Sequence, residues 1–242
     1  MDKAHEPTRT FVFGGRVSSR RKSSAAPLTP VCVLRSRVPP SVRRPAPPML
    51  SVRRVTFETD VVASLRVVQT RSITQSWVQT GIGFLDHVLR LFAACSGMTL
   101  NICCVGDSWV DWHHTCEDVG IALGLALSAA IRRHNPLRYG FIIIPMDEAL
   151  VRCSFDLHGG GGFHSSDESH VFKASALADL SFTVLDALAK RAGICLHVDV
   201  LKASNTHHAA EAMFKAFGLC CRNAFNASRP LTTKGDPLIL WR

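Results

Sequence analysis

The stretch Asp111-Trp112-His113-His114-Thr115-Cys116-Glu117-Asp118 places two adjacent imidazoles one helical turn before a carboxylate. On a helix, His113 and Glu117 are four residues apart and share a face. His114 points about 100° away from that face, because a helix has about 3.6 residues per turn. We therefore expect His113 and His114 to reach two different metal ions rather than one.

The same pattern returns 94 positions later as His207-His208-Ala209-Ala210-Glu211. Upstream of the histidine pairs, Gly97 and Leu89 return as Gly193 and Leu185 at an offset of 96. Self-similarity at a fixed spacing indicates that a unit of structure has been duplicated. A single His-His-x-x-Glu string arises by chance on solvated helix faces, whereas its duplication predicts a two-metal site.

Hydrophobic periodicity predicts the same order of elements, ββαβα, in both halves of the ordered chain. In the first half-unit, about residues 51–135, we expect strands at 54–59, 61–69 and 98–105 and helices at 81–94 and 113–133. In the second, about residues 136–235, we expect strands at 139–144, 149–157 and 194–201 and helices at 174–191 and 207–223. The predicted fold class is α+β, with the two half-units packed as one domain and their helices against β-sheets.

Composition and charge exclude several classes of protein. Apolar residues make up 47% of the chain, as in ordinary globular proteins. The longest apolar run, residues 119–131, is too short for a membrane span, so we expect no membrane association. The formal net charge of +9 is concentrated in residues 1–50, which leaves about +1 for the other 192 residues. The ordered part therefore gives no general electrostatic reason to expect a nucleic-acid partner.

The two chain ends and the cysteines indicate the cellular setting. Residues 1–50 are rich in Arg, Ser and Pro and have no apolar periodicity, so we expect a disordered basic extension. That composition is also typical of an organelle transit peptide, which predicts a plastid location, with the mitochondrion and the cytoplasm as alternatives. Residues 236–242 are expected to form a C-terminal tail. Nine cysteines without a Cys-x-x-Cys pair indicate free thiols in a reducing compartment rather than a disulfide framework.

The candidate metal ligands are five imidazoles and two carboxylates. His87, in the predicted helix 81–94, would by itself be a structural residue, but it precedes a histidine pair in the same half-unit. The full set is His87, His113, His114, Glu117, His207, His208 and Glu211. Several histidines with carboxylates suit octahedral Mn²⁺ or Fe²⁺ better than a closed structural zinc site. We expect Asp118 to orient one of the ligand imidazoles.

Several of these strings, in the same order, resemble the imidazoleglycerol-phosphate dehydratase family of histidine biosynthesis. The resemblance runs from about residue 54 to residue 235, nearly all of the ordered chain. The motifs that carry it are TGIGFLDH at 80–87, HHTCED at 113–118, RYG at 138–140, PMDEAL at 145–150, NTHH at 205–208 with Glu211, FKA at 214–216 and TTKG at 232–235.

The resemblance implies a hydro-lyase that eliminates water from imidazole glycerol phosphate to give imidazole acetol phosphate. It also implies two Mn²⁺ ions per active site and a homo-oligomer of 24 subunits with active sites between subunits. Metal ions bound to both ring nitrogens would favour an imidazolate-like substrate ring, while carboxylates move the protons. Glu58 matches the family's early acidic position, and Glu211 or Glu148 is expected to share that catalytic role. The residues that match the family's phosphate-binding positions are Arg138, Lys215, Thr232 and Lys234.

Two positions depart from the family pattern. The counterpart of His87 in the second half-unit is Thr183, a poor metal ligand that Asp179 or water would have to replace. Gly160 stands where the family has a phosphate-binding arginine. Two alternatives follow: a working dehydratase with weaker metal binding, or a degenerate paralogue that binds metal and co-assembles without turnover. A non-enzymatic metal-binding or shell-forming subunit and an unrelated two-metal hydrolase are further alternatives, although no nucleophile motif or Gly-rich phosphate loop supports the hydrolase.

Overall fold

A computed structural model describes residues 48–68, 75–157, 160–173 and 175–226. All of them belong to one compact unit, Pro45–Arg242. The predicted transit peptide, the C-terminal tail and the phosphate-binding candidates Thr232 and Lys234 lie outside the described residues. The first strand among the described residues begins at Leu50, so the last residue of the predicted N-terminal extension belongs to a strand.

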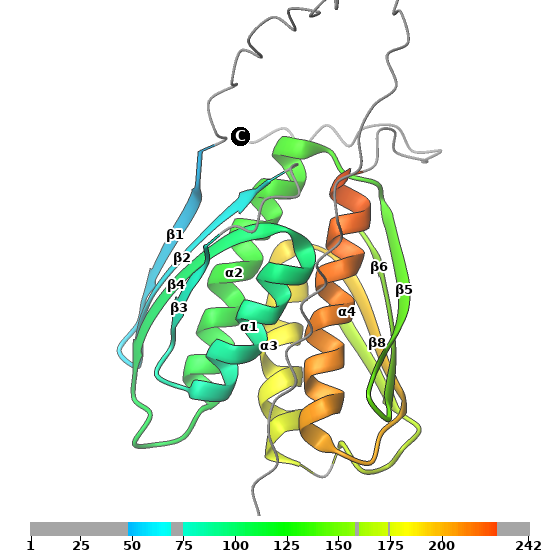
Figure 1. Cartoon of the computed structure of the whole chain (residues 1–242). Helices are drawn as coiled ribbons and strands as arrows, with labels where there is room; N and C mark the ends of the chain where they lie inside the picture. Colours follow the sequence, from blue (N-terminus) through cyan, green and yellow to red (C-terminus); the bar gives the residue numbers. More distant parts are fainter. Residues whose placement is uncertain (1–47, 69–74, 158–159, 174, 227–242) are drawn as a thin grey trace, which may run out of the picture. The chain divides into compact units, whose positions relative to one another are not determined.

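The two half-units contain the same series of elements (Figure 1). The first consists of β1 (Leu50–Val55), β2 (Thr59–Val67), β3 (Trp77–Gln79), α1 (Gly83–Ser96), β4 (Met98–Gly106) and α2 (His113–His134). The second consists of β5 (Tyr139–Met146), β6 (Ala149–Asp156), β7 (Gly162–Asp167), α3 (Ala176–Ala192), β8 (Cys195–Lys202) and α4 (Thr206–Asn226). The predicted ββαβα order is confirmed, with one additional strand in each half.

The additional strands complete two four-stranded sheets of identical topology, β1-β2-β4-β3 and β5-β6-β8-β7. In each sheet the last strand pairs in parallel and the other neighbours are antiparallel. Sequence patterns missed β3 because it has three residues, and β7 because Gly162–Asp167 is polar and lacks apolar alternation.

The first turn also differs from the prediction. We expected the strand break at Asp60, but the chain turns at residues 56–58, and Asp60 pairs with Val55. Arg53, on the neighbouring strand, donates two hydrogen bonds to the Asp60 carboxylate, at 3.1 and 2.7 Å. An acidic residue that is paired in this way can occupy a strand, although its intrinsic strand propensity is low.

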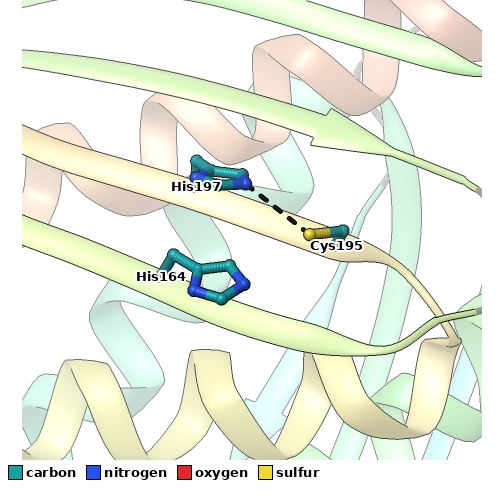
Figure 2. A group of neighbouring side chains, drawn as sticks. All are labelled: His164, Cys195 and His197. Atoms are coloured by element: carbon teal, nitrogen blue, oxygen red, sulfur yellow. Dashed lines mark hydrogen bonds between the residues drawn. The ribbon is translucent and has the colours of Figure 1, made fainter.

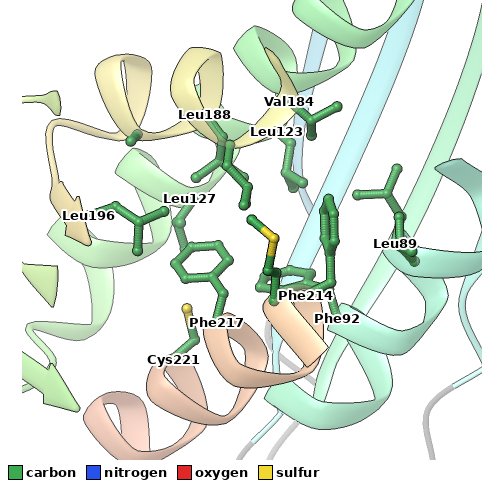
Figure 3. Close-up of a cluster of buried hydrophobic side chains, with 14 of the residues drawn as sticks. Leu89, Phe92, Leu123, Leu127, Val184, Leu188, Leu196, Phe214, Phe217 and Cys221 are labelled. Carbon is green, nitrogen blue, oxygen red and sulfur yellow. The ribbon is translucent and has the colours of Figure 1, made fainter. Parts of the chain in front are cut away.

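The four helices lie between the two sheets and pack across the halves (Figure 1). Helix α2 packs against α3 and α1 against α4, while α2 also covers the first sheet and α4 the second. The shared core therefore takes side chains from all four helices, as Figure 3 shows for Leu89, Leu123, Leu188 and Phe217. Neither half-unit buries its helices alone.

The glycines that recur in the sequence end equivalent helices. Gly97 and Gly193 follow α1 and α3 with φ of 70° and 73°, in the left-handed region that favours glycine. Their N–H groups donate to the carbonyls of Ala93 and Ala189, which satisfies acceptors at the helix ends. The equivalent turns direct β4 and β8 back along their sheets.

Helix α2 is both long and apolar. At 22 residues it is long and apolar enough to cross a membrane by length and composition alone, since it extends beyond the apolar run 119–131. Within this structure 67% of its most apolar window is buried, chiefly against α3 and the first sheet. This burial identifies α2 as a core helix.

The eight described cysteines are all free thiols.

Candidate metal centre

Three of the predicted metal ligands meet where α1 packs against α4. Nε2 of His87 lies 2.7 Å from Oε1 of Glu211, and Nε2 of His207 lies 2.9 Å from the same oxygen. His207 and Glu211 come from adjacent turns of α4, and His87 comes from the facing helix. All three ligand atoms lie within 4.8 Å of one another. We call this group the α1/α4 cluster.

Glu211 is held ionised in this cluster. Burial, to 7% exposure, raises its pKa, but hydrogen bonds from Lys215, His87 and His207 outweigh that effect and lower the pKa to about 2. The ammonium of Lys215 lies 2.6 Å from Oε2 of Glu211, and it also reaches the sulfur of Met146. Lys215, predicted to bind phosphate, is therefore paired with a ligand carboxylate in this structure.

The donor set of the α1/α4 cluster fits a divalent transition-metal ion. Two imidazole nitrogens and one carboxylate oxygen, brought together from two helices, are ligands that Mn²⁺, Fe²⁺ and Zn²⁺ accept in proteins. Both imidazoles already lie beside the same carboxylate oxygen. Metal–ligand bonds from these three donors to one ion could therefore replace the two hydrogen bonds. The arrangement leaves further coordination positions for water or substrate.

The equivalent place between α2 and α3 is less complete. His113 and Thr183 line a cavity of about 530 Å³ there, and Asp179, one turn before Thr183, lines it as well. Glu117 instead lines a separate hollow with Asp186 and neighbouring residues. Among the described residues, no compact group of three ligands forms at this helix pair.

His114 contacts carboxylates outside the helix pairs. Its Nδ1 lies 2.9 Å from Asp107, and its Nε2 lies 3.6 Å from Glu58 in the β1–β2 turn. The hydrogen bond with Asp107 is the main cause that raises the pKa of His114. An imidazole in this position can therefore hold a proton beside Glu58, one of the three predicted catalytic carboxylates.

His208 repeats this arrangement in the second half. Its Nδ1 lies 2.9 Å from Glu148, and its Nε2 lies 3.6 Å from Asp147. The bond from His208, together with Glu148's own backbone N–H, lowers the pKa of Glu148 to about 2, and the same contact raises the pKa of His208. Glu58 and Glu148 occupy equivalent turns, so the second histidine of each pair faces a predicted catalytic carboxylate.

The expectation that Asp118 orients a ligand imidazole is wrong. Its carboxylate accepts hydrogen bonds from Arg54 at 2.8 Å and from the hydroxyl of Thr59 at 2.5 Å, which ties α2 to the first sheet. Asp107 holds the His114 imidazole instead. Asp107 and Asp147 were not predicted from the sequence. The available signal was that Asp107 directly follows β4, which leads to the first histidine pair, and that Asp147 lies beside Glu148 in the turn between β5 and β6.

Equivalent caps place the two histidine pairs at the starts of their helices. The Asp111 carboxylate accepts a hydrogen bond from the backbone N–H of His113 at 2.7 Å. The side-chain oxygen of Asn205 accepts one from the N–H of His207 at 2.9 Å. Side chains of this type at a helix start satisfy N–H groups that have no partner within the helix.

Arg138 lies far from the α1/α4 cluster of its own chain. Its guanidinium donates two hydrogen bonds to Asp156, at 2.7 and 2.8 Å, and the pKa of Arg138 is raised mainly by that pairing. The preceding residue, Leu137, donates to the carbonyl of Ala224, near the end of α4. Residues 207 and 224 are about 25 Å apart along a helix, at 1.5 Å per residue. Apart from its chain neighbours, no atom of the described residues lies within 4 Å of where a Cβ at Gly160 would be.

Comparisons with known proteins agree with this architecture. The family model of imidazoleglycerol-phosphate dehydratase matches residues 80–221. The imidazoleglycerol-phosphate dehydratase of Listeria monocytogenes serotype 4a (strain HCC23) is 41% identical over 188 residues, covering 75% of this chain and 95% of the relative. That of Chlorobium phaeovibrioides is 40% identical over 176 residues, covering 71% and 85%.

Two solved structures are also similar. The crystal structure of imidazoleglycerol-phosphate dehydratase from Staphylococcus aureus N315 matches with a TM-score of 0.63 and 32% identity, over 74% of this chain and 99% of the other. The Pyrococcus furiosus protein, in complex with (S)-C348, matches with a TM-score of 0.61 and 31% identity, over 76% and 99%.

Proposed function

The chain belongs to the imidazoleglycerol-phosphate dehydratase family of hydro-lyases, and from this membership we propose that it eliminates water from imidazole glycerol phosphate in histidine biosynthesis. The product would be imidazole acetol phosphate. At the site, one observation carries the proposal: His87 and His207 converge on the ionised carboxylate of Glu211. This group of donors is suited to the metal-assisted removal of a weakly acidic proton.

We propose that two Mn²⁺ ions serve each active site. The α1/α4 cluster would hold one ion, and His113, His114, Glu117 and His208 would contribute to completing the pair of centres. When bound, the ions would supply positive charge to the imidazole of the substrate. In place of a histidine at Thr183, water or Asp179 would fill a coordination position beside His113, in the cavity that these residues share.

Glu58 and Glu148 are the carboxylates best placed to move protons. Both lie in partly exposed turns, with side chains 51% and 36% exposed, and each has an imidazole of a histidine pair beside it. Glu211, by contrast, is buried and already accepts hydrogen bonds from two imidazoles and an ammonium. We therefore assign Glu211 to metal binding and the proton transfers to Glu58 and Glu148, in place of a shared role for all three.

The active site is proposed to lie between subunits of a homo-oligomer, with 24 subunits as the family resemblance implies. Arg138 is too far from His207 of the same chain to bind phosphate there, so a neighbouring copy would supply it. Large apolar side chains are exposed near Glu58 and His113: Val55, Phe57, Trp109, Val110 and Trp112. Exposed apolar groups of this kind mark surfaces that another chain covers.

Lys215, Thr232 and Lys234 would complete the phosphate site. The basic composition of the N-terminal residues supports a plastid location.

The decisive experiment is turnover of imidazole glycerol phosphate by the full-length protein with added Mn²⁺. We expect metal-dependent formation of imidazole acetol phosphate, lost on chelation and in the His113→Ala and His207→Ala variants. His170→Ala, which changes an exposed imidazole in the turn after β7, is the matched control and should keep its activity. Turnover that survives in His207→Ala would contradict the proposed site.

The second candidate function is a degenerate paralogue that binds metal and co-assembles without turnover. Thr183 and Gly160, which replace a family histidine and arginine, favour it. The same experiment separates the two functions: a large assembly that binds Mn²⁺ but produces no imidazole acetol phosphate would support the paralogue. Light scattering of the full-length protein measures the assembly independently of turnover.

A further inference from the structure

Three metal-binding side chains that the dehydratase centre does not use meet on the outer face of the second sheet (Figure 2). Cys195 and His197 lie two residues apart on β8, so they share a face of the strand. His164 on β7 is the register partner of His197, and the two imidazole rings stack with centroids 4.7 Å apart. The three donor atoms lie within 4.8 Å of one another.

We propose that His164, Cys195 and His197 form a second metal site, selective for Zn²⁺ or a cation of similar softness. A thiolate with two imidazoles favours Zn²⁺ over Mn²⁺, which prefers oxygen ligands. With Zn–S of about 2.3 Å and Zn–N of about 2.0–2.1 Å, a tetrahedral site separates sulfur from nitrogen by about 3.6 Å. Sγ of Cys195 and Nε2 of His197 are 3.6 Å apart.

The site is arranged by the strands themselves. Gly162 is the register partner of Cys195, and a Cβ at Gly162 would lie 3.4 Å from Nε2 of His164. The imidazole of His164 therefore lies over Gly162, on the side of Cys195, where a larger residue would crowd it. His164 and His197 are exposed, so the fourth coordination position faces solvent, as in three-ligand zinc sites that keep an open position.

The two carboxylates next to the ligands on this face are paired with arginines. Asp156, the register partner of Cys195 on β6, accepts two hydrogen bonds from Arg138, at 2.7 and 2.8 Å. The next outward residue of β8, Asp199, accepts hydrogen bonds from Arg152 at 2.9 Å and from Ser166 at 2.7 Å. Its carboxylate is therefore committed to a separate network. The donor set remains one sulfur and two nitrogens, which sets its preference apart from that of the α1/α4 cluster with its carboxylate.

The duplicated first sheet shows that the fold does not require ligands at these positions. At the offset of 96, Thr99 and Asn101 are equivalent to Cys195 and His197. The residue in register with Asn101 is Trp77, where the second sheet has His164. None of these three residues offers a thiolate or imidazole, so the ligand set belongs to the second half alone.

Protection of Cys195 from alkylation tests the site in the unaltered full-length protein. We expect Zn²⁺ to slow alkylation of Cys195 at least about 10-fold, because a metal-bound thiolate is a poorer nucleophile. Mn²⁺ should leave the rate unchanged, and a chelator should restore it. Cys103, a partly exposed thiol on β4, is the internal control in the same peptide map. Equal alkylation rates of Cys195 with and without Zn²⁺ would overturn the proposal.

Cobalt in place of zinc gives an independent readout, since a thiolate ligand produces a charge-transfer absorption band. We expect this band in the unaltered protein and in His207→Ala, and its loss in Cys195→Ser and His164→Asn. A band that disappears in His207→Ala but survives in Cys195→Ser would overturn the site. Neither readout depends on dehydratase turnover, so failure of the proposed function and failure of this site are distinguishable.

Discussion

The α1/α4 and α2/α3 helix pairs come from duplicated sequence, yet they carry different ligand sets. The first pair brings together His87, His207 and Glu211, whereas the second has Thr183 where the first has His87. The second pair also differs in its carboxylate, because Glu117 lines a separate hollow, whereas Glu211 lies between the two imidazoles of the first pair. The duplicated scaffold therefore positions ligands, but the individual side chains decide whether each position binds metal.

The two sheets also differ, and here it is the second half that carries the additional metal-binding side chains. The first sheet has Trp77, Thr99 and Asn101 where the second has His164, Cys195 and His197. The half that lacks a histidine on its first helix thus has additional ligands on its outer sheet face. The first half alone has a histidine on its first helix, and the second half alone has the three ligands on its sheet, so the equivalent positions of the other half serve as controls.

The largest expected effect comes from breaking the complete cluster. His207→Ala removes an imidazole that converges on Glu211, and we expect it to lower the affinity of the tightest class of Mn²⁺ sites at least about 100-fold. His113→Ala, at the equivalent position of the incomplete pair, should affect mainly the weaker class. Titration calorimetry with Mn²⁺ measures both classes, and identical losses in the two variants would contradict the inequality of the helix pairs.

A second test addresses what the helix pairs share. Gly124 and Gly218 recur at the offset of 94, and both lie where helices cross. A Cβ at Gly124 would lie 2.6 Å from the Leu188 carbonyl oxygen, and one at Gly218 would lie 2.8 Å from that of Phe92. Alanine at either position should lower the free energy of unfolding by about 1–3 kcal/mol, because backbone atoms must move apart.

Chemical denaturation measures this loss, with Gly160→Ala as the matched control. In the part of the chain that the structure describes, only chain neighbours come within 4 Å of a Cβ at Gly160, so its replacement should change the free energy of unfolding by less than about 0.5 kcal/mol. If Gly124→Ala and Gly218→Ala behave like this control, the helices can separate without cost and the close crossing does not constrain the sequence.

The recurring glycines help to explain why the fold was predictable from the sequence, since Gly97 and Gly193 end helices, whereas Gly124 and Gly218 lie where helices cross. Duplication fixed Gly97, Gly193, Gly124 and Gly218 at equivalent places, and apolar periodicity identified all four helices and six strands. The strands β3 and β7 remained hidden, because a three-residue strand and a polar strand are defined by their parallel partners rather than by their own residues. Pairing of this kind follows from the tertiary fold.

The sites likewise combine contacts that local sequence spacing predicts with contacts that only the tertiary fold creates. His207 and Glu211 are one helical turn apart, so local spacing predicted their contact. The bond of Asp107 to His114 depends on the path of the β4–α2 connection, which local spacing does not define. His164 lies far from Cys195 in sequence, and only the parallel register of β7 and β8 brings them together.

A third test makes the two helix pairs alike. Thr183→His places an imidazole in the cavity beside His113, and we expect it to raise the Mn²⁺ affinity of the weaker class of sites about 10-fold. Thr183→Val, which has a similar shape but no donor, is the control and should not raise affinity. Unchanged affinity in Thr183→His would mean that another group, such as Asp179, already fills the position.

The smallest expected effect concerns the connections that lead into the helices. In the first half, the Asp86 carboxylate accepts hydrogen bonds from the N–H and the hydroxyl of Thr80, both at 2.7 Å. In the second half, the Asp167 carboxylate accepts from the N–H of Ser169 at 3.0 Å and from the N–H of Lys173 at 2.9 Å. A different carboxylate therefore organises each connection.

Asp167 should make the second connection sensitive to acid. Burial raises its pKa, but hydrogen bonds from Ser169 and backbone N–H groups outweigh this and lower the pKa below its ordinary 3.8. A lowered pKa means that the stabilisation is present above that ordinary value and is lost as the pH falls through the folded-state pKa. Asp167→Asn should therefore cost about 1 kcal/mol at neutral pH, and the difference from the unaltered protein should shrink toward about pH 3. Urea denaturation across this range, with the exposed neighbour Glu168→Gln as control, measures the effect, and a difference that grows on acidification would show that the Asp167 carboxylate does not stabilise the connection.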